Sequence, residues 1–224
     1  MNADVHAAAF STAVRSGSPL ADPRVEAVID RMQAQRRRPP NGGPMASGSI
    51  DPRDYADFGF SIYPEQGELI YLLCRALRAK RVVDFATSVG FSALYFAAAM
   101  RDNGGGEVVG AEIVAEKIAT ARRNLDDAGL SGFVDIRRGD ARETLRNVGG
   151  DIDFALIDGW PGGEGRSLAL DVIQVLAPQM QCGAIALNDN AEPDYLDYVR
   201  NPANGFRSMT LPLKGSTELS VRMD

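Results

Sequence analysis

The stretch VVDFATSVGFSALYFA, residues 82–97, decides the fold class of this chain. It opens with a short apolar run that is typical of a buried strand and ends in an apolar helical run, so a strand leads through a turn into a helix. Gly90 in the turn lets the backbone approach a ligand closely before the helix begins. On either side of this stretch, strand-like and helical segments alternate, which predicts a mainly parallel sheet with helices on both faces.

Most of the expected elements can be assigned from their periodicity. Strands are predicted at 82–85, 107–111, 133–137, 152–157 and 183–187, and helices at 22–38, 64–78, 91–101, 114–128, 141–147 and 167–177. Residues 206–213 and 218–223 predict a hairpin that adds an antiparallel strand at one edge, giving seven strands. We expect residues 1–58 to form a helical extension and a flexible loop of the same domain, and residues 59–224 to form the ligand-binding part.

Composition limits the class of protein. A chain of 224 residues suits one α/β domain, and its net charge of -6 argues against non-specific nucleic-acid binding. No apolar run approaches the length of a membrane span, and no secretion signal is recognised. Cys74 and Cys182 form no CxxC pair, so both are expected to be reduced and buried in a cytoplasmic protein. His6, the single histidine, argues against a histidine base or metal ligand.

The turn that follows the first predicted strand favours a ribose-containing ligand. Ligands of open α/β sheets bind beyond the carboxyl ends of the strands, and Glu112 at the end of the next strand can accept hydrogen bonds from ribose hydroxyls. Ala86 and Ser88 stand where a dinucleotide-binding turn has glycines, so a nicotinamide cofactor is disfavoured. An ordinary strand-to-helix turn with a surface glutamate is the alternative.

Four further segments follow the first in a recognisable order: GAEIVAEKIATARRNL (110–125), IRRGDARETL (136–145), DFALIDGW (153–160) and GAIALNDN (183–190). Together they resemble the class I methyltransferases with their Rossmann-like fold, and most closely the catechol O-methyltransferase-like family of cation-dependent enzymes. The resemblance covers nearly three quarters of the chain. It implies that residues 59–224 bind S-adenosylmethionine and transfer its methyl group to a hydroxyl of a small, aromatic, catechol-like molecule.

The resemblance also implies the positions of the cofactor and the substrate. The residues expected to contact the cofactor are Ile62, Asp84, Ala86, Thr87, Gly90, Ser92, Glu112, Asp140, Ala141, Asp158 and Trp160, with Ser61 nearby. Among these, Glu112 would bind the ribose, and Asp140 and Ala141 would border the adenine. Candidate walls of the acceptor site are Phe58, Phe60, Trp160 and Tyr195, each with a role in the core or at the surface as its alternative.

Three residues predict a metal site and carry the expected catalysis. Asp158 ends one predicted strand, and Asp189 and Asn190 follow the next, so neighbouring parallel strands would bring them to one rim. This all-oxygen set suits Mg²⁺, Ca²⁺ or Mn²⁺. A phenol with a pKa of about 10 lies roughly three units from ionisation at neutral pH, or about 4 kcal/mol, which a bound cation can supply. Strand-end residues without a metal are the alternative.

One departure from the resembling family leaves the chemistry open. Pro161 stands where many relatives carry a lysine that acts as general base, and Arg166 cannot replace it because arginine keeps its proton. The metal alone can suffice, Glu164 or Asp158 can take the proton, or the reaction differs. The alternatives are an enzyme that methylates nitrogen or carbon or performs a non-transfer reaction, and a non-catalytic nucleotide-binding module. We expect a homodimer that acts on a small molecule, with no nucleic-acid or membrane partner.

Overall fold

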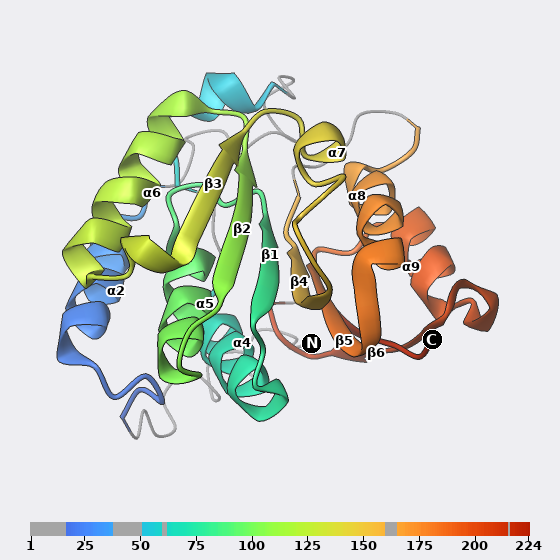
Figure 1. Ribbon diagram of the computed structural model, residues 1–224. Coiled ribbons are helices and arrows are strands. Elements are labelled where there is room, and N and C mark those ends of the chain that lie inside the picture. Colours follow the sequence, from blue (N-terminus) through green and yellow to red (C-terminus); the bar gives the residue numbers. More distant parts are fainter. Residues whose placement is uncertain (1–16, 38–50, 60–61, 160–164, 215) are drawn as a thin grey trace, which may run out of the picture.

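Seven strands form one sheet in the order β3-β2-β1-β4-β5-β7-β6 (Figure 1). The computed structural model describes residues 17–37, 51–59, 62–159, 165–214 and 216–224. The strands are β1 (Arg81–Phe85), β2 (Glu107–Glu112), β3 (Val134–Arg138), β4 (Ile152–Ile157), β5 (Met180–Asp189), β6 (Phe206–Leu211) and β7 (Thr217–Arg222). β1 to β5 run parallel, while β7 pairs antiparallel with both β5 and β6. This confirms the predicted fold class.

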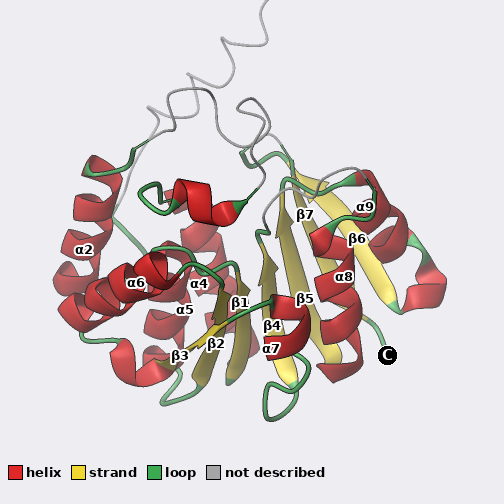
Figure 2. Ribbon diagram, turned by 90° about the horizontal axis from the view of Figure 1, so that it is seen from above, coloured by secondary structure: helices red, strands yellow, loops and turns green. Residues whose placement is uncertain are grey.

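Helices cover both faces of the sheet, as Figure 2 shows. One face carries α2 (Pro23–Ala34), α4 (Pro64–Leu77), α5 (Phe91–Asp102) and α6 (Ala115–Ala128). The other carries α7 (Ala141–Thr144), α8 (Leu168–Leu176) and α9 (Pro193–Arg200). Short 3-10 helices are Pro52–Tyr55, Ser131–Phe133, Ala177–Gln179 and Pro202–Asn204. Within the described ranges, no helix is both long and apolar enough to cross a membrane.

The two faces of the sheet bury two separate apolar clusters. On the α5 side, Phe96 meets Phe154 of β4 with ring centroids 5.4 Å apart and an edge-on geometry. On the α8 side, Ile173 and Leu176 pack with Tyr195 of α9. Each fully buried large side chain contributes about 1.5–3 kcal/mol. The sheet is therefore packed between two apolar clusters, one on each face.

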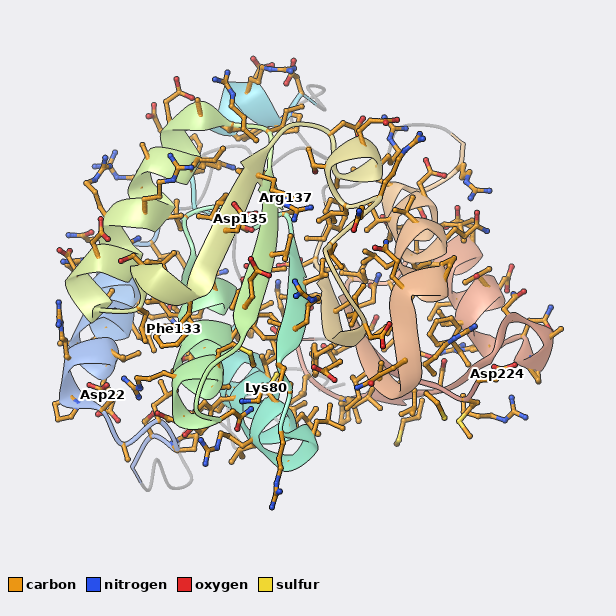
Figure 3. The ribbon with its side chains drawn as sticks, in the orientation of Figure 1. Asp22, Lys80, Phe133, Asp135, Arg137 and Asp224 are labelled. Carbon is orange, nitrogen blue, oxygen red and sulfur yellow. The ribbon has the colours of Figure 1, made fainter. Side chains whose placement is uncertain are left out.

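Helix ends follow the signals in the sequence. Asp22 caps α2 by accepting hydrogen bonds from the backbone N–H groups of Arg24 and Val25, as expected for a residue before a first-turn proline. The side chain of Asp22, labelled in Figure 3, also pairs with Arg101 of α5. α6 ends at Gly129, whose φ of 71° is a left-handed conformation that glycine adopts easily. The pair between Asp22 and Arg101 therefore connects the start of α2 to α5.

Several predicted boundaries change in the structure. α2 ends at Ala34 rather than residue 38, and β5 begins three residues earlier than expected. α9 was not predicted, since its eight residues lie in a polar stretch. The predicted hairpin lies at one edge of the sheet, where its second strand, β7, pairs with β5 and its first strand, β6, is outermost. Cys182 is exposed, not buried, because β5 begins with three exposed residues after Met180.

Candidate cofactor and acceptor site

Four acidic residues gather at the carboxyl edge of the sheet. The register places Phe85 opposite both Ala111 and Ile157, and Ile157 opposite Asn188. Asp84, Glu112, Asp158 and Asp189 therefore lie at or just beyond the ends of neighbouring parallel strands. This is the region where ligands of open α/β sheets bind.

Glu112 closes the turn after β1. One carboxylate oxygen accepts a hydrogen bond from the backbone N–H of Ser88 at 2.9 Å, and the other accepts from the N–H groups of Ile113 and Val114, both at 2.8 Å. The residue is 7% exposed. A carboxylate offers about four acceptor positions, so the turn uses three and leaves room for a ligand donor.

Asp84 carries a buried oxygen without a partner. Its Oδ1 accepts a hydrogen bond from the Ser92 hydroxyl at 2.8 Å. Its Oδ2 has no hydrogen-bond partner among the described residues, and neither has the buried Oγ of Ser88. Burial raises the pKa of Asp84 to about 7, although the hydrogen bond from Ser92 opposes this shift. Buried polar atoms are normally paired, so these two atoms indicate the place of a polar ligand or of water.

Two residues of this turn adopt a conformation that favours glycine. The φ angles of Ala86 and Ser88 are 61° and 50°. Gly90 follows with a φ of 87°, and a Cβ added there would lie 3.1 Å from the Cβ of Ala121. A non-glycine residue in the left-handed region costs about 1–3 kcal/mol and persists where the surroundings enforce it, often at functional sites. The turn is therefore held in shape by its neighbours rather than by its own residue types.

We expect Ala86→Gly to raise the free energy of unfolding by about 1 kcal/mol, because relief of the left-handed strain exceeds the added entropy of the unfolded chain. Urea unfolding measures the change. Ala119→Gly, on the exposed face of α6, is the matched control and should destabilise by about 1 kcal/mol. Equal destabilisation by both substitutions would contradict the assignment of strain to Ala86.

The raised pKa of Asp84 predicts a pH dependence of stability. Between its ordinary value of 3.8 and about 7, the folded protein keeps a proton on Asp84 that the unfolded chain has lost. Stability of the unliganded protein therefore falls as pH rises through this window. Asp84→Asn should flatten the slope by up to about 1.4 kcal/mol per pH unit. Urea unfolding at several pH values within the window tests this, and identical slopes for both proteins would contradict it.

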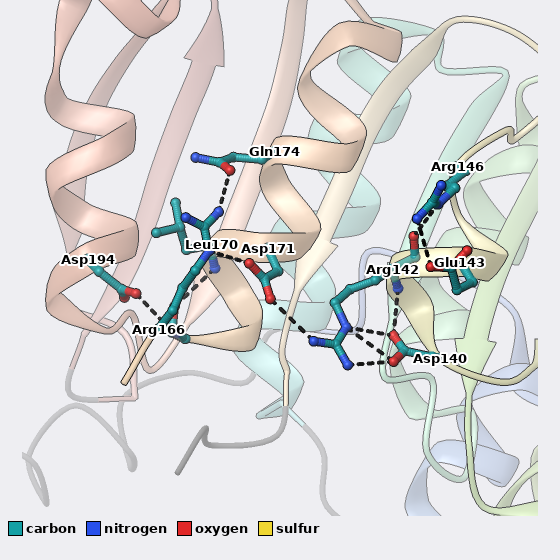
Figure 4. Close-up of polar contacts among 10 residues, drawn as sticks. Asp140, Arg142, Glu143, Arg146, Arg166, Leu170, Asp171, Gln174 and Asp194 are labelled. Atoms are coloured by element: carbon teal, nitrogen blue, oxygen red, sulfur yellow. Dashed lines mark hydrogen bonds and ion pairs between the residues drawn. The ribbon is translucent and has the colours of Figure 1, made fainter. Parts of the chain in front are cut away.

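Asp140 begins α7 at the expected adenine edge. Its side chain caps the helix through the backbone N–H of Arg142 at 2.9 Å and pairs with the guanidinium of the same residue at 2.6 Å. Asp171 of α8 accepts from Arg142 at 3.5 Å and pairs with Arg166 (Figure 4). The charged residues line a cavity of about 460 Å³. Ala141 itself is buried in the core, so Asp140 is the half of this predicted pair that faces solvent.

The predicted metal site at the carboxyl ends of β4 and β5 is built around Asp189, whose side chain is fully buried. Its Oδ1 accepts from the Gln66 amide at 2.9 Å, and its Oδ2 accepts from the Asn190 amide at 3.1 Å and pairs with the ammonium of Lys214. Burial, together with the charge of Asp189, raises the pKa of Asp158 well above its ordinary value. The two predicted carboxylates follow Ile157 and Asn188, which lie opposite each other in neighbouring strands, so they meet at the same edge of the sheet.

The arrangement of these residues does not fit a divalent cation as it stands. Each oxygen of Asp189 already accepts hydrogen bonds, and the position beside Oδ2 holds the ammonium of Lys214. Asn190 directs its amide nitrogen, a donor, at Asp189. Within the described ranges no three or more His, Cys, Asp or Glu side chains are placed so that together they could hold a metal ion. The predicted requirement for a cation stays a prediction.

Part of the predicted site lies outside the described residues: Trp160, Phe60, Ser61, Pro161 and Glu164. Ile62 is buried in the core near the start of α4, and Phe58 is half-buried. Tyr195 is fully buried in the α8 side core, so its prediction as a wall of the acceptor site was wrong. The apolar face of α9 turns it toward the sheet.

Two site residues were missed from sequence. Gln66 lies in the first turn of α4, and its side chain links the backbone N–H of Tyr63, the hydroxyl of Thr217 and Asp189. A glutamine three residues after the N-cap residue of a helix, here Tyr63, is a capping signal that could have drawn attention to it. Lys214 lies in the turn between β6 and β7, and no local pattern connects it with β5.

Comparison with known proteins identifies relatives of the central part of the chain. A family model described as a methyltransferase domain matches residues 85–191. Catechol O-methyltransferases from Niastella koreensis and Mycobacterium tuberculosis are 32% and 33% identical over 102 and 99 residues. These matches cover 44% of this chain in each case, and 45% and 44% of the two relatives, so the chain spans less than half the length of either.

Solved structures agree over the whole length. A methyltransferase from Geobacter sulfurreducens superposes with a TM-score of 0.69 at 19% identity, covering 100% of this chain and 99% of that chain. At that identity the likeness establishes the fold, which is that of the class I methyltransferases. Residues 85–191 therefore match a methyltransferase domain family, and part of the chain is similar to catechol O-methyltransferases.

Proposed function

We propose that this protein transfers the methyl group of S-adenosylmethionine to a hydroxyl of a small aromatic molecule. The observation that carries the proposal is the carboxyl edge itself. There, Glu112 and Asp84 flank the turn after β1, and each has acceptor capacity left for a ligand. The names of the two sequence relatives, both catechol O-methyltransferases, support a hydroxylated aromatic acceptor.

The turn fits the donor molecule in chemical character. The unpartnered Oδ2 of Asp84 and Oγ of Ser88 suit the polar amino-acid part, because a buried acceptor beside a cationic amino group is relieved of its desolvation penalty. Glu112 suits the ribose hydroxyls. Asp140 at the start of α7 stands where the adenine would end. The donor molecule carries no phosphate, in keeping with the acidic character of the edge.

The reaction asks little covalent chemistry of the protein. The hydroxyl oxygen of the acceptor attacks the methyl carbon, the bond from carbon to sulfur breaks, and its electron pair stays on sulfur, so the sulfonium becomes a neutral thioether. The hydroxyl proton leaves to water. The protein has to hold the two reactants in line and to favour negative charge on the acceptor oxygen. A cationic group beside Asp158 and Asp189 would supply the second effect, either as the predicted divalent ion or as a side chain.

Incubation with S-adenosylmethionine and a panel of catechols and simple phenols, followed by mass spectrometry, tests the proposal. We expect a methylated product and S-adenosylhomocysteine in equal amounts. Binding of S-adenosylhomocysteine without any product from this panel would point to a changed acceptor or reaction. Absence of calorimetric binding would contradict the proposal and favour a non-catalytic module.

The predicted partners belong to the same proposal. A small hydroxylated acceptor is the expected substrate, and a homodimer is the expected assembly. Light scattering on a size-exclusion column measures the mass in solution against the 24.0 kDa of one chain. A mass of one chain would contradict the dimer and leave the proposed reaction unaffected.

A further inference from the structure

A lysine side chain lies at the carboxyl end of β5, beside the predicted metal ligand Asp189. Lys214 lies in the turn between β6 and β7, 25 residues beyond Asp189, and its ammonium pairs with Oδ2 of that carboxylate. The lysine side chain is 17% exposed and the aspartate side chain is fully buried. The ammonium also lies 5.5 Å from the ring centroid of Tyr63, within the range of a cation–π contact. This charge is therefore seated in a defined place and is not a freely moving surface lysine.

The surroundings fix both members of the pair. On the far side of the carboxylate, Gln66 donates to Oδ1 of Asp189 and to the hydroxyl of Thr217, both at 2.9 Å. The hydroxyl of Thr217 in turn donates to the carbonyl of Leu213 at 3.0 Å, next to Lys214. The hairpin turn is thus tied to the carboxyl end of β5 through side chains that are themselves buried.

The position of the ammonium coincides with the one that sequence reasoning assigned to a divalent ion. The ammonium of Lys214 is in direct contact with Asp189. The charge of Lys214 also acts on Asp158, the second predicted metal ligand. A divalent ion at the same oxygen would be repelled strongly by an ammonium group within a few ångströms. The site at Asp189 can therefore hold either the ammonium of Lys214 or a divalent ion, but not both.

We propose that Lys214 is a built-in cation of the acceptor site, which takes the place of a bound divalent ion and makes methyl transfer independent of added metal. The statement about activity rests on the proposed function, whereas the statement about metal exclusion does not. In the reaction, the ammonium donates a hydrogen bond to the acceptor oxygen and stabilises the negative charge that develops there as the hydroxyl proton leaves to water. Lys214 keeps its own protons throughout.

Binding of Mn²⁺, followed by electron paramagnetic resonance, tests metal exclusion without any turnover. We expect the wild-type protein to bind Mn²⁺ weakly, and Lys214→Met to bind it at least about tenfold more tightly, because the competing charge is removed. Lys214→Arg, which keeps the charge, should behave like wild type. Tight Mn²⁺ binding by wild type, or equal affinity in wild type and Lys214→Met, would overturn the proposal.

A matched control and a variant that preserves folding complete the binding experiment. Lys80 lies at the opposite, amino end of β1, where its ammonium contacts the backbone carbonyls of Asn103 and Gly105 (Figure 3). Lys80→Met removes an equal charge and should leave Mn²⁺ binding unchanged.

If Lys214→Met does not fold, the double variant Asp189→Asn with Lys214→Met removes both charges and should bind Mn²⁺ no better than wild type. Tight binding by this neutral pair would contradict the assigned site.

Methyl transfer in the presence of a chelator tests the second part. With EDTA, wild type and Lys80→Met should keep full activity, and Lys214→Met should lose about a hundredfold in kcat and recover part of it with Mn²⁺. Loss of wild-type activity in EDTA, restored by Mg²⁺, would overturn metal independence. A protein that transfers no methyl group under any condition would refute the proposed function instead, and the Mn²⁺ measurements would still decide whether Lys214 excludes the ion.

Discussion

Asp189→Ala is expected to lower the free energy of unfolding by about 3 kcal/mol, because removal of one member of a buried pair leaves the other uncompensated. The substitution deprives Lys214 of its carboxylate and Gln66 of its acceptor in one step. The lysine is 17% exposed and regains part of its hydration, which keeps the expected loss at the lower end of the usual range. Urea unfolding measures it directly.

Asp135→Ala supplies the control for a surface ion pair. Asp135 pairs with Arg137 on β3 at 3.0 Å, and its side chain is half exposed (Figure 3). Exposed pairs contribute about 0–1 kcal/mol, so this variant should lose far less stability. Asp189→Asn retains an acceptor for Gln66 and should lie between the two. If Asp189→Ala were as stable as Asp135→Ala, the pair with Lys214 would not be the buried interaction described above.

Glu112→Ala is expected to weaken binding of S-adenosylhomocysteine by about a hundredfold. Hydrogen bonds to a charged group contribute about 1.5–3 kcal/mol each, and the substitution removes the expected ribose acceptor. It also frees the three backbone N–H groups that hold the turn after β1 in shape. Isothermal titration calorimetry measures the affinity.

Controls for this variant separate its local effects. Glu116→Ala, in the exposed first turn of α6, removes a charge four residues away and should leave the affinity unchanged. Glu112→Gln keeps the size of the side chain and one acceptor oxygen, so it should bind more tightly than Glu112→Ala. Unchanged affinity in Glu112→Ala would show that the ribose is held elsewhere or that the chain has no such site.

Local sequence signals predicted the fold well where they follow from periodicity. β4 has the predicted bounds, and α5 and α6 agree to within one residue, because an apolar repeat together with Gly90 or Gly129 at a helix end specifies such elements. The predicted antiparallel hairpin formed at one edge of the sheet, but the sequence did not show which of its two strands pairs with β5. Pairing of β7 with β5 depends on long-range hydrogen bonds that leave no repeat in the sequence.

The candidate site divides in the same way. Topology alone brings Asp84, Glu112, Asp158 and Asp189 to one edge, since the ends of neighbouring parallel strands meet there. The left-handed φ angles of Ala86 and Ser88 were not predictable, because neither residue type favours them and the surrounding turn imposes them.

The sequence by itself therefore determined the alternating order of strands and helices and the acidic residues at the strand ends, because both features depend only on residues that are close together in the sequence. Only the tertiary structure decided what those acids meet. Gln66 reaches Asp189 across 123 residues and Lys214 across 25, through packing of α4 and the hairpin against the end of β5. Such contacts depend on how whole helices and strands pack against one another, and no short segment of the sequence specifies that packing.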